Sequence, residues 1–281
     1  MFKKPKIKVQ GSPLDSDTLP APVKSTKFFP DWYKKLKRTE HKGLGSVTDA
    51  TVKRCIPFRE AMGAGITIPL WADIAINVYQ IYHMYDTDGE YIGDHEDVNQ
   101  DGADYLVGKV HDQTGKTVGS YTKGDVNFQM AFHGNYEPDA GHEAYGRHET
   151  AQIGGLADHL YCKTVLKLHS PWVISTPKGW SAYYKPYPNS VCDLRIFEGL
   201  VDIDTYRTWV NFPFYWAGRE TGTFIIKKGT PIAQVLFIKR DMPDIEYSAV
   251  DYEETVRVDK LLHSSIQDSY LLNFWHKRKE R

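Results

Sequence analysis

The sequence has 281 residues, of which 41% are hydrophobic and 25% charged, and these values exclude a chain that is disordered along most of its length. Its 35 Lys and Arg residues nearly balance its 36 Asp and Glu residues, which argues against binding duplex nucleic acid through an overall positive field. Aromatic residues make up 13% of the chain and favour large contact surfaces.

The sequence shows no leader and no membrane-spanning segment. The basic residues 1–6 are not followed by an apolar stretch, so a signal peptide is not expected. No run approaches the ~20 apolar residues of a spanning helix. Cys55, Cys162 and Cys192 form no CxxC pair, which fits free thiols in a reducing compartment. We therefore expect a cytoplasmic or virion-associated protein that is not secreted.

Residues 1–50 are expected to form an extended N-terminal arm, because prolines interrupt them and their apolar residues keep no period. The exception is residues 30–36, where the spacing of aromatic and apolar residues predicts one or two helical turns. Ordering such an arm costs roughly 1–2 kcal/mol per residue. We therefore predict that its aromatic anchors dock on the body or on a neighbouring copy. These anchors are Phe28, Phe29, Trp32 and Tyr33.

Residues 51–250 are predicted to form a β-rich core domain, because short stretches rich in β-branched and aromatic residues recur between Pro and Gly. Many short strands at modest spacing favour an antiparallel barrel or jelly roll. Residues 83–123 are interpreted as an insertion of hairpins, with turns at 86–90 and 112–115. The expected strands are 66–70, 74–82, 105–110, 116–121, 125–130, 165–168, 172–175, 180–184, 195–197, 207–212, 223–226 and 233–238.

The C-terminal residues 251–281 are expected to form a helical tail. Only here, at about residues 259–276, does an apolar face persist over a helical length. The tail ends in a short basic stretch at residues 275–279. That stretch is interpreted as a solvated terminus, with contact to an acidic partner surface or to nucleic acid as the alternative.

Three segments of the C-terminal half carry a resemblance to a known superfamily. They are residues 176–181 (TPKGWS), 199–204 (GLVDID) and 228–235 (KGTPIAQV). Their order and residue patterns resemble those of the trimeric dUTPase and dCTP deaminase superfamily. The β-clip core of that superfamily carries a P-x-G-type turn, a D-x-D hairpin and an IAQ strand. With the opening at residues 54–58 and 65–70, the whole pattern also resembles an uncharacterised family of bacterial and phage proteins.

The resemblance implies a β-clip core, assembly as a trimer and, for an active enzyme, nucleotide hydrolysis with Mg²⁺. In the superfamily, the aspartate that matches Asp202 helps to activate a water for attack on the α-phosphorus of a nucleotide. Asp204, Tyr206 and Gln234 are the other residues that this chemistry would use here.

The chain departs from the superfamily pattern where that chemistry lies. Residues 185–190 (KPYPNS) occupy the place of the GRSG-type phosphate-binding segment. Thr205 displaces the discriminating tyrosine by one position, and the Gly-rich phosphate lid at the C-terminus is missing. We therefore expect Asp202 and Asp204 to serve the hairpin and its turn on a scaffold that lacks hydrolase chemistry.

A cluster of oxygen donors resembles the first half of a calcium-binding loop. The donors are Asp97, Asn99, Asp101 and Asp104, and Gly102 permits a sharp turn among them. The twelfth position is Gly108, so the usual bidentate glutamate is absent. We expect a polar turn without metal; the alternative is a weak Ca²⁺ site with a dissociation constant on the order of 10⁻⁴–10⁻³ M.

Histidines crowd the region from residue 133 to residue 169, interleaved with acidic residues. Two or three of them converging would make a zinc or non-haem iron site, for which His133, His142 and His148 are the candidates. No HxxxH helix and no HxD strand motif stands out in this region, so histidines at the surface or in hydrogen bonds are favoured.

Together these features favour a non-catalytic structural or binding protein on a dUTPase-like β-clip scaffold, such as a phage virion or assembly component. We expect a homo-oligomer, with a trimer implied by the resemblance, or contacts with other structural proteins. No cofactor, membrane or nucleic-acid partner is expected, and an enzyme is the less favoured class. The alternatives are a divergent dUTPase- or dCTP deaminase-like nucleotide hydrolase, which would need Mg²⁺, and a metal-dependent β-sandwich enzyme that uses the His-rich region.

Overall fold

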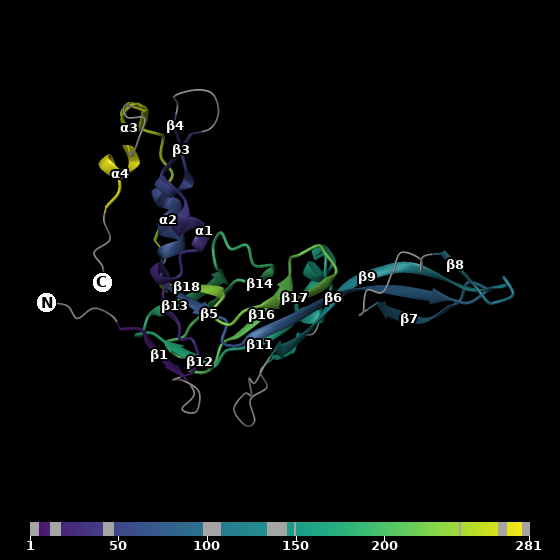
Figure 1. Ribbon diagram of the computed structural model, residues 1–281. Helices are drawn as coiled ribbons and strands as arrows, with labels where there is room; N and C mark the ends of the chain where they lie inside the picture. The colour runs from purple at the N-terminus through teal and green to yellow at the C-terminus, as the bar shows by residue number, and fades with distance from the viewer. Residues whose placement is uncertain are drawn as a thin grey trace.

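The computed structural model describes residues 6–11, 18–41, 48–97, 108–133, 145–148, 150–241, 243–263 and 269–276. Its regular structure is mainly β-strand, and the named strands all pair antiparallel (Figure 1). The predicted antiparallel, mainly β fold is therefore confirmed. The predicted barrel is wrong, because the sheets in the described part of the chain stay open and do not close on themselves.

Three sheets make up the body, and each is named here by one of its central strands. The β18 sheet has the order β15 (Gly199–Val201), β13 (Trp180–Pro186), β18 (Pro231–Lys239), β5 (Ile66–Pro69) and β2 (Val23–Lys24). The β16 sheet has the order β10 (Tyr145–Arg147), β11 (Leu166–His169), β16 (Asn211–Trp216) and β14 (Leu194–Ile196). The β6 sheet has the order β17 (Gly222–Ile226), β6 (Asp73–Tyr85), β9 (Thr117–His133) and β8 (Gly108–His111), and β7 (Tyr91–Asp97) also pairs with β6. Two strand pairs complete the fold: β1 (Lys8–Gly11) with β12 (Trp172–Ser175), and β3 (Thr39–His41) with β4 (Thr48–Ala50).

The sheets share one hydrophobic core. Because successive side chains of a strand point to opposite faces, β6 buries Ile74, Ile76 and Val78 and leaves the residues between them half-buried. β18 differs, since residues 232–235 are all buried in succession. It is the middle strand of its sheet, and this pattern indicates that both of its faces are covered.

A long ribbon projects from the body, formed by the continuation of β6 and β9 with β7 and β8 alongside (Figure 1). Its two turns lie where the sequence predicts them. The Asp86 carboxylate accepts a hydrogen bond from the backbone N–H of Glu90 (2.9 Å), and the Asp112 carboxylate accepts one from Thr114 (2.8 Å). The hairpins predicted as an insertion at 83–123 are therefore extensions of two core strands.

The N-terminal arm docks on the body through α1 (Asp31–Lys35). Tyr33 of this helix is only 2% exposed and stacks on Phe58 of α2 (Ile56–Gly63), with ring centroids 6.0 Å apart. The predicted docking of the aromatic anchors is thus confirmed for Tyr33, whereas Trp32 beside it remains exposed.

Helix α2 lies in the predicted β-rich core domain, before the first strand that the sequence predicts there, and no helix is expected at this place. Its signal is Pro57 in the first turn, where a missing N–H breaks no helical hydrogen bond, followed by the helix formers of residues 59–62. Short 3₁₀ turns occur at η1 (Ser25–Lys27), η2 (Val52–Arg54), η4 (Thr150–Gln152) and η5 (Gly154–His159). Within the described ranges, no helix is long and apolar enough to cross a membrane.

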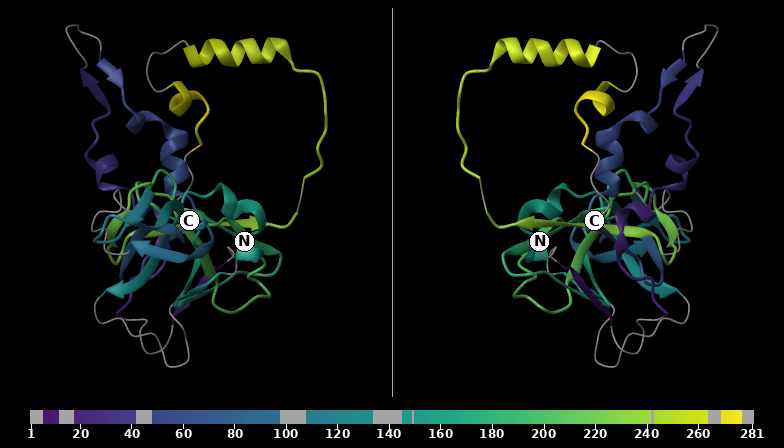
Figure 2. Two further views of the ribbon diagram at one scale, coloured as in Figure 1. Left: turned by 90° about the vertical axis from the view of Figure 1, so that its right-hand side faces the viewer. Right: turned by 90° about the vertical axis from the view of Figure 1, so that its left-hand side faces the viewer.

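The C-terminal tail contains α3 (Tyr252–His263) and α4 (Ser269–Asn273). The helix predicted at about 259–276 begins too late, because Asp251 caps α3 by accepting a hydrogen bond from the Glu254 N–H (3.0 Å). Figure 2 shows the chain arching away from the sheets before α3, and none of the described residues of α3 is buried.

Candidate functional site

Two of the predicted site residues, Asp202 and Asp204, meet Arg240 just beyond the end of β18. Both carboxylate oxygens of Asp204 accept hydrogen bonds from the guanidinium, and its Nη1 atom lies 2.9 Å from Oδ1 of Asp204 and 3.1 Å from Oδ1 of Asp202. The Gly179 N–H donates to Asp204 (2.8 Å), and the Ser181 hydroxyl donates to Asp202 (2.5 Å). These five residues are called the aspartate clasp below.

The aspartate clasp ties together three distant parts of the chain. Gly179 adopts a φ of 85°, which other residues rarely adopt, and its N–H donates to Asp204. The N–H of Arg240 donates in turn to the Gly179 carbonyl (3.1 Å). The clasp thereby joins the turn before β13, the D-x-D hairpin and the end of β18.

The clasp also lowers the pKa of its two carboxylates. Hydrogen bonds from Arg240, and then from the Gly179 N–H, lower the pKa of Asp204 to about 2. The pKa of Asp202 is lowered as well, first by the Ser181 hydroxyl and then by Arg240. A carboxylate with a lowered pKa is a weaker proton acceptor, so this arrangement suits the holding of a turn better than the activation of a water.

The other two residues of the predicted hydrolase site have different surroundings. Gln234 is buried in β18, and its Nε2 donates to the carbonyls of Ala61 and Ala64 (both 2.8 Å) at the end of α2. Carbonyls at a helix C-terminus lack intrahelical partners, so the Gln234 side chain supplies the hydrogen-bond donor that these carbonyls of α2 would otherwise lack. Tyr206 is exposed at the surface. The structure thus brings Asp202 and Asp204 together and engages Gln234 elsewhere.

Of the four predicted calcium ligands, one lies within the described residues. Asp97 ends β7, while Asn99, Asp101 and Asp104 lie outside the described residues. In the described ranges, no group of three or more His, Cys, Asp or Glu side chains is placed to hold a metal ion.

The three histidine candidates do not form a described group. His133 is the last residue of β9, His142 lies outside the described residues, and His148 follows β10 with its N–H bonded to the Val165 carbonyl (3.1 Å). The metal-enzyme alternative therefore stays a prediction.

A polar cleft of about 900 Å³ lies beside β9 and β10 and includes His148. Both acidic and basic side chains line it, among them Glu96, Asp125 and Arg147. The Lys163 ammonium on the same wall donates to the Asp158 carbonyl (2.8 Å), so it helps to hold η5 in place. The mixed charges of this cleft favour no single class of ligand.

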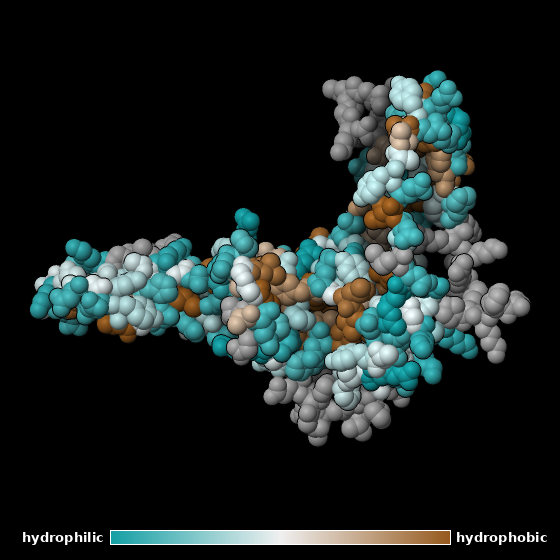
Figure 3. Space-filling model, turned by 180° about the vertical axis from the view of Figure 1, so that it is seen from behind, coloured by the Kyte–Doolittle hydropathy of each residue, from teal (hydrophilic) through white to brown (hydrophobic). Residues whose placement is uncertain are grey.

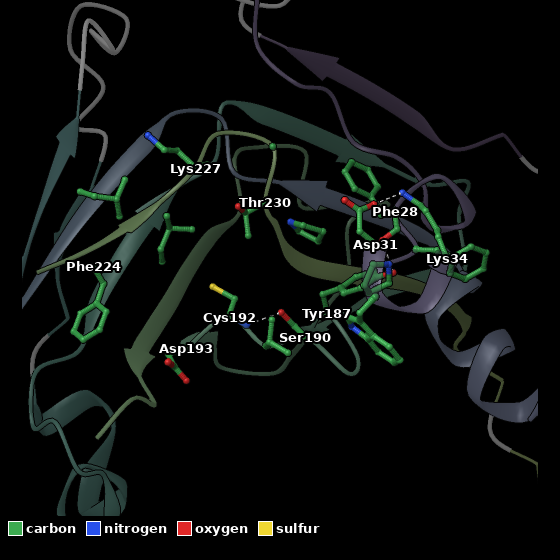
Figure 4. A pocket seen from close by; sticks show the side chains of 18 of the residues that line it. Phe28, Asp31, Lys34, Tyr187, Ser190, Cys192, Asp193, Phe224, Lys227 and Thr230 are labelled. Carbon is green, nitrogen blue, oxygen red and sulfur yellow. Dashed lines mark hydrogen bonds and ion pairs between the residues drawn. The ribbon is translucent and has the colours of Figure 1, made fainter. Parts of the chain in front are cut away.

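An apolar cleft of about 650 Å³ opens between the N-terminal arm and β17 (Figure 4). Its walls are the segments 27–34, 187–193 and 224–231, together with Trp216. The side chains that face it are mostly aromatic or aliphatic, with a few charged groups among them. This feature is called the apolar cleft below.

The wall of the apolar cleft is fixed, but its mouth is open to solvent. The Tyr187 hydroxyl donates to the Phe28 carbonyl (3.0 Å), and burial raises the pKa of Tyr187 to about 12. Among the residues that line the cleft, Val191 is 86% exposed, and Trp32 and Ile225 are also exposed. The cleft thus presents an ordered apolar surface that the described residues leave uncovered.

A second uncovered apolar surface lies in residues 243–251, called the tail segment below. All nine residues are exposed, and none of them belongs to a helix or strand. Among them, Ile245 is 76% exposed, Tyr247 91% and Val250 73%. On the body itself, Figure 3 shows further hydrophobic residues at the surface, near the foot of the upward projection that carries α2, β3 and β4 in Figure 1.

No protein-family model matches the chain, and a search of the curated proteins finds no match. Among solved structures, the chain is similar to a dUTPase from phage phi11 of S. aureus, at 14% identity over 31% of this chain and 74% of that one, with a TM-score of 0.24. It is also similar to the Staphylococcus bacteriophage 80alpha dUTPase, at 16% identity over 30% and 71%, with a TM-score of 0.22. A 2'-deoxycytidine 5'-triphosphate deaminase from Agrobacterium tumefaciens matches at 13% identity over 61% and 69%, with a TM-score of 0.24.

These solved structures have the fold type that the three sequence segments resemble. TM-scores this low carry no argument about what the chain does, so its function has to be inferred from the clasp, the cleft and the tail segment. Sequence reasoning missed Arg240 and the apolar cleft. The only signal for the cleft was the aromatic content of residues 28–33, and Arg240 carried no local motif.

Proposed function

We propose that this chain is a non-catalytic structural subunit that assembles with copies of itself. The observation that carries the proposal is the tail segment, in which Ile245, Tyr247 and Val250 are all more than two-thirds exposed. Several large apolar side chains exposed within one short segment favour a contact with another molecule. The tail segment lies in the stretch that arches away from the sheets in Figure 2, so it can meet another copy without any rearrangement of the sheets.

The aspartate clasp supports the non-catalytic part of the proposal. Arg240 pairs with both Asp202 and Asp204, so each carboxylate has a cationic partner within the chain. Nucleotide hydrolysis needs a carboxylate that is free to accept a proton or to bind Mg²⁺. The phage proteins in the sequence resemblance favour a virion or a virion-assembly particle as the setting of such a subunit.

The assembly is tested by light scattering during size-exclusion chromatography of the full chain. We expect the parent protein to run as an oligomer and the double variant Ile245→Asp/Tyr247→Asp to run with the mass of one chain, because two charges cannot be buried unpaired in an apolar contact. The matched control is Tyr91→Asp, another exposed aromatic residue, on the ribbon. A parent protein with the mass of a single chain at all concentrations would contradict the proposal.

The absence of catalysis is tested by incubating the protein with dUTP or dCTP and Mg²⁺. We expect no release of pyrophosphate or ammonia above a blank. Release that is abolished by Asp202→Asn, with the fold intact by circular dichroism, would establish the hydrolase alternative instead.

A further inference from the structure

We infer that the apolar cleft is the acceptor for the tail segment of a second copy. This inference rests on the proposed function, since it names the surface with which the assembling tail makes contact. Four properties of the described residues support it: the direction of the tail, the apolar match, the charge balance and the edge position of β17.

The tail segment is directed away from its own apolar cleft. Residues 229–231 line the cleft at the start of β18, whereas the tail leaves from the other end of the same strand. At about 3.3 Å per residue, the nine residues of β18 place these two ends roughly 26 Å apart. The tail then arches outward, and its end returns to α2, where the Trp275 ring lies 5.3 Å from the guanidinium of Arg59. A second copy is therefore the better acceptor.

The two surfaces match in chemistry. A segment bound in extended form places alternate side chains on one side, so Ile245 and Tyr247 would then present an aliphatic and an aromatic group together. The cleft offers aromatic walls from Phe28 and Phe224 and an exposed apolar mouth at Val191. A volume of about 650 Å³ is large enough for two such side chains.

One charge of the cleft is available to meet the acidic tail segment. The tail segment contains no basic residue and three acidic ones, Asp244, Glu246 and Asp251. The cleft is lined by three lysines and by two aspartates, Asp31 and Asp193. Lys34 is bound to Asp31 at 3.2 Å and Lys227 to Asp73 at 2.9 Å, so Lys27 carries the least compensated charge of the three lysines. An ion pair between Lys27 and the tail segment would make the association sensitive to salt.

The edge of the β6 sheet adds a backbone contribution. β17 is the terminal strand of this sheet in the described part of the chain, and its residues 224–226 line the cleft. An extended segment can add to such an edge through main-chain hydrogen bonds, with alternate side chains filling pockets. The tail segment belongs to no helix or strand of its own, so its backbone is available for this mode of binding.

The contact has a consequence for the assembly. Donor and acceptor are different surfaces of the chain, so the interface is head-to-tail. Such an interface either closes into a ring or continues as a filament. A ring would give every copy both a filled cleft and a covered tail.

The inference is tested by placing a photo-cross-linking amino acid at position 247 of the full chain. Isotope-labelled and unlabelled copies are mixed before illumination, so that mass spectrometry distinguishes links between copies from links within one copy. We expect mixed-isotope links from position 247 to residues 27–34 or 187–193.

Each other outcome overturns a defined claim. Mixed-isotope links to a different surface, in an oligomer that the tail variant dissolves, would overturn the acceptor and leave the proposed function standing. Links confined to a single copy, in a protein with the mass of one chain, would overturn both.

A cleft variant gives an independent measurement. Val191→Asp changes a side chain that is almost fully exposed, so the subunit should fold normally, as circular dichroism would verify. We expect it to weaken association about tenfold, because a charge then has to be buried against the tail. Val118→Asp, an exposed position on the ribbon, is the matched control and should leave association unchanged. If Val191→Asp and Val118→Asp associate equally strongly, the inference is overturned.

Discussion

β18 and the tail segment lie in one stretch of chain, yet their apolar residues have opposite surroundings. In β18, Ile232, Ala233 and Val235 are buried between neighbouring strands. A few residues later, the comparable side chains Ile245 and Val250 are exposed. The difference teaches that this chain stabilises one apolar segment by its own sheets and leaves the next exposed, which is the basis of the proposed contact with another copy.

The energetic reason follows from the area removed from water. A fully buried aliphatic side chain contributes about 1.5–3 kcal/mol to stability, whereas an exposed one contributes almost nothing. The same Ile245 that adds nothing to a single chain stabilises a complex once its surface is covered. The stability of a single subunit and the stability of the assembly should therefore respond to different residues.

The largest expected effect is on a matched pair of isoleucines. Ile232→Ala, in β18, should lower the free energy of unfolding by about 2–5 kcal/mol, because it leaves a cavity in the core. Ile245→Ala, in the tail segment, should change it by less than about 0.5 kcal/mol in dilute protein that has dissociated to single chains. Urea unfolding followed by circular dichroism measures both. A large loss for Ile245→Ala under these conditions would show that the tail is covered within its own chain.

A smaller effect is expected at the polar residue of β18. Gln234→Leu leaves the Ala61 and Ala64 carbonyls without their donor, and a buried unsatisfied acceptor costs about 1–3 kcal/mol. Gln10→Leu, at an exposed position of β1, is the matched control and should stay within about 0.5 kcal/mol. Equal stability of the two variants in urea would contradict the structural role given to Gln234.

A third effect depends on pH and concerns the aspartate clasp. The pKa of Asp204 in the folded chain is about 2, below its ordinary value of 3.8, so ionisation of this group stabilises the fold. That contribution is complete above about pH 5 and is lost as the pH falls from about 4 towards 2. Asp204→Asn should therefore flatten the stability curve in this window, measured as urea midpoints from pH 2 to 7. Parallel curves for parent and variant would contradict the clasp.

Much of the β framework could be predicted from the sequence. Alternation in residues 74–82 and in 125–130 marks strands that the structure contains within β6 and β9, and both ribbon turns were predicted from their Asp and Gly residues. The sequence does not predict α2, because the helix is only eight residues long and its few helix formers come directly after a proline.

The candidate site was less predictable than the framework. The clasp depends on Arg240, which lies 36 residues from Asp204 in sequence and carries no motif of its own. The apolar cleft is assembled from segments as distant as residues 27–34 and 224–231, and no local pattern records such a meeting. The spacing of the strands in the sequence also cannot predict whether the sheets close into a barrel, because closure depends on how the sheet edges meet in space.

The most direct test of the central claim, that another copy covers the tail segment, is amide hydrogen exchange at residues 244–251. It would be measured at one protein concentration below the midpoint of association and at one above it. The account predicts unprotected exchange in the dilute protein and slowed exchange in the concentrated protein, in step with residues 187–193 of the apolar cleft. Unprotected exchange of residues 244–251 at both concentrations, with the concentrated protein shown to be associated, would contradict it.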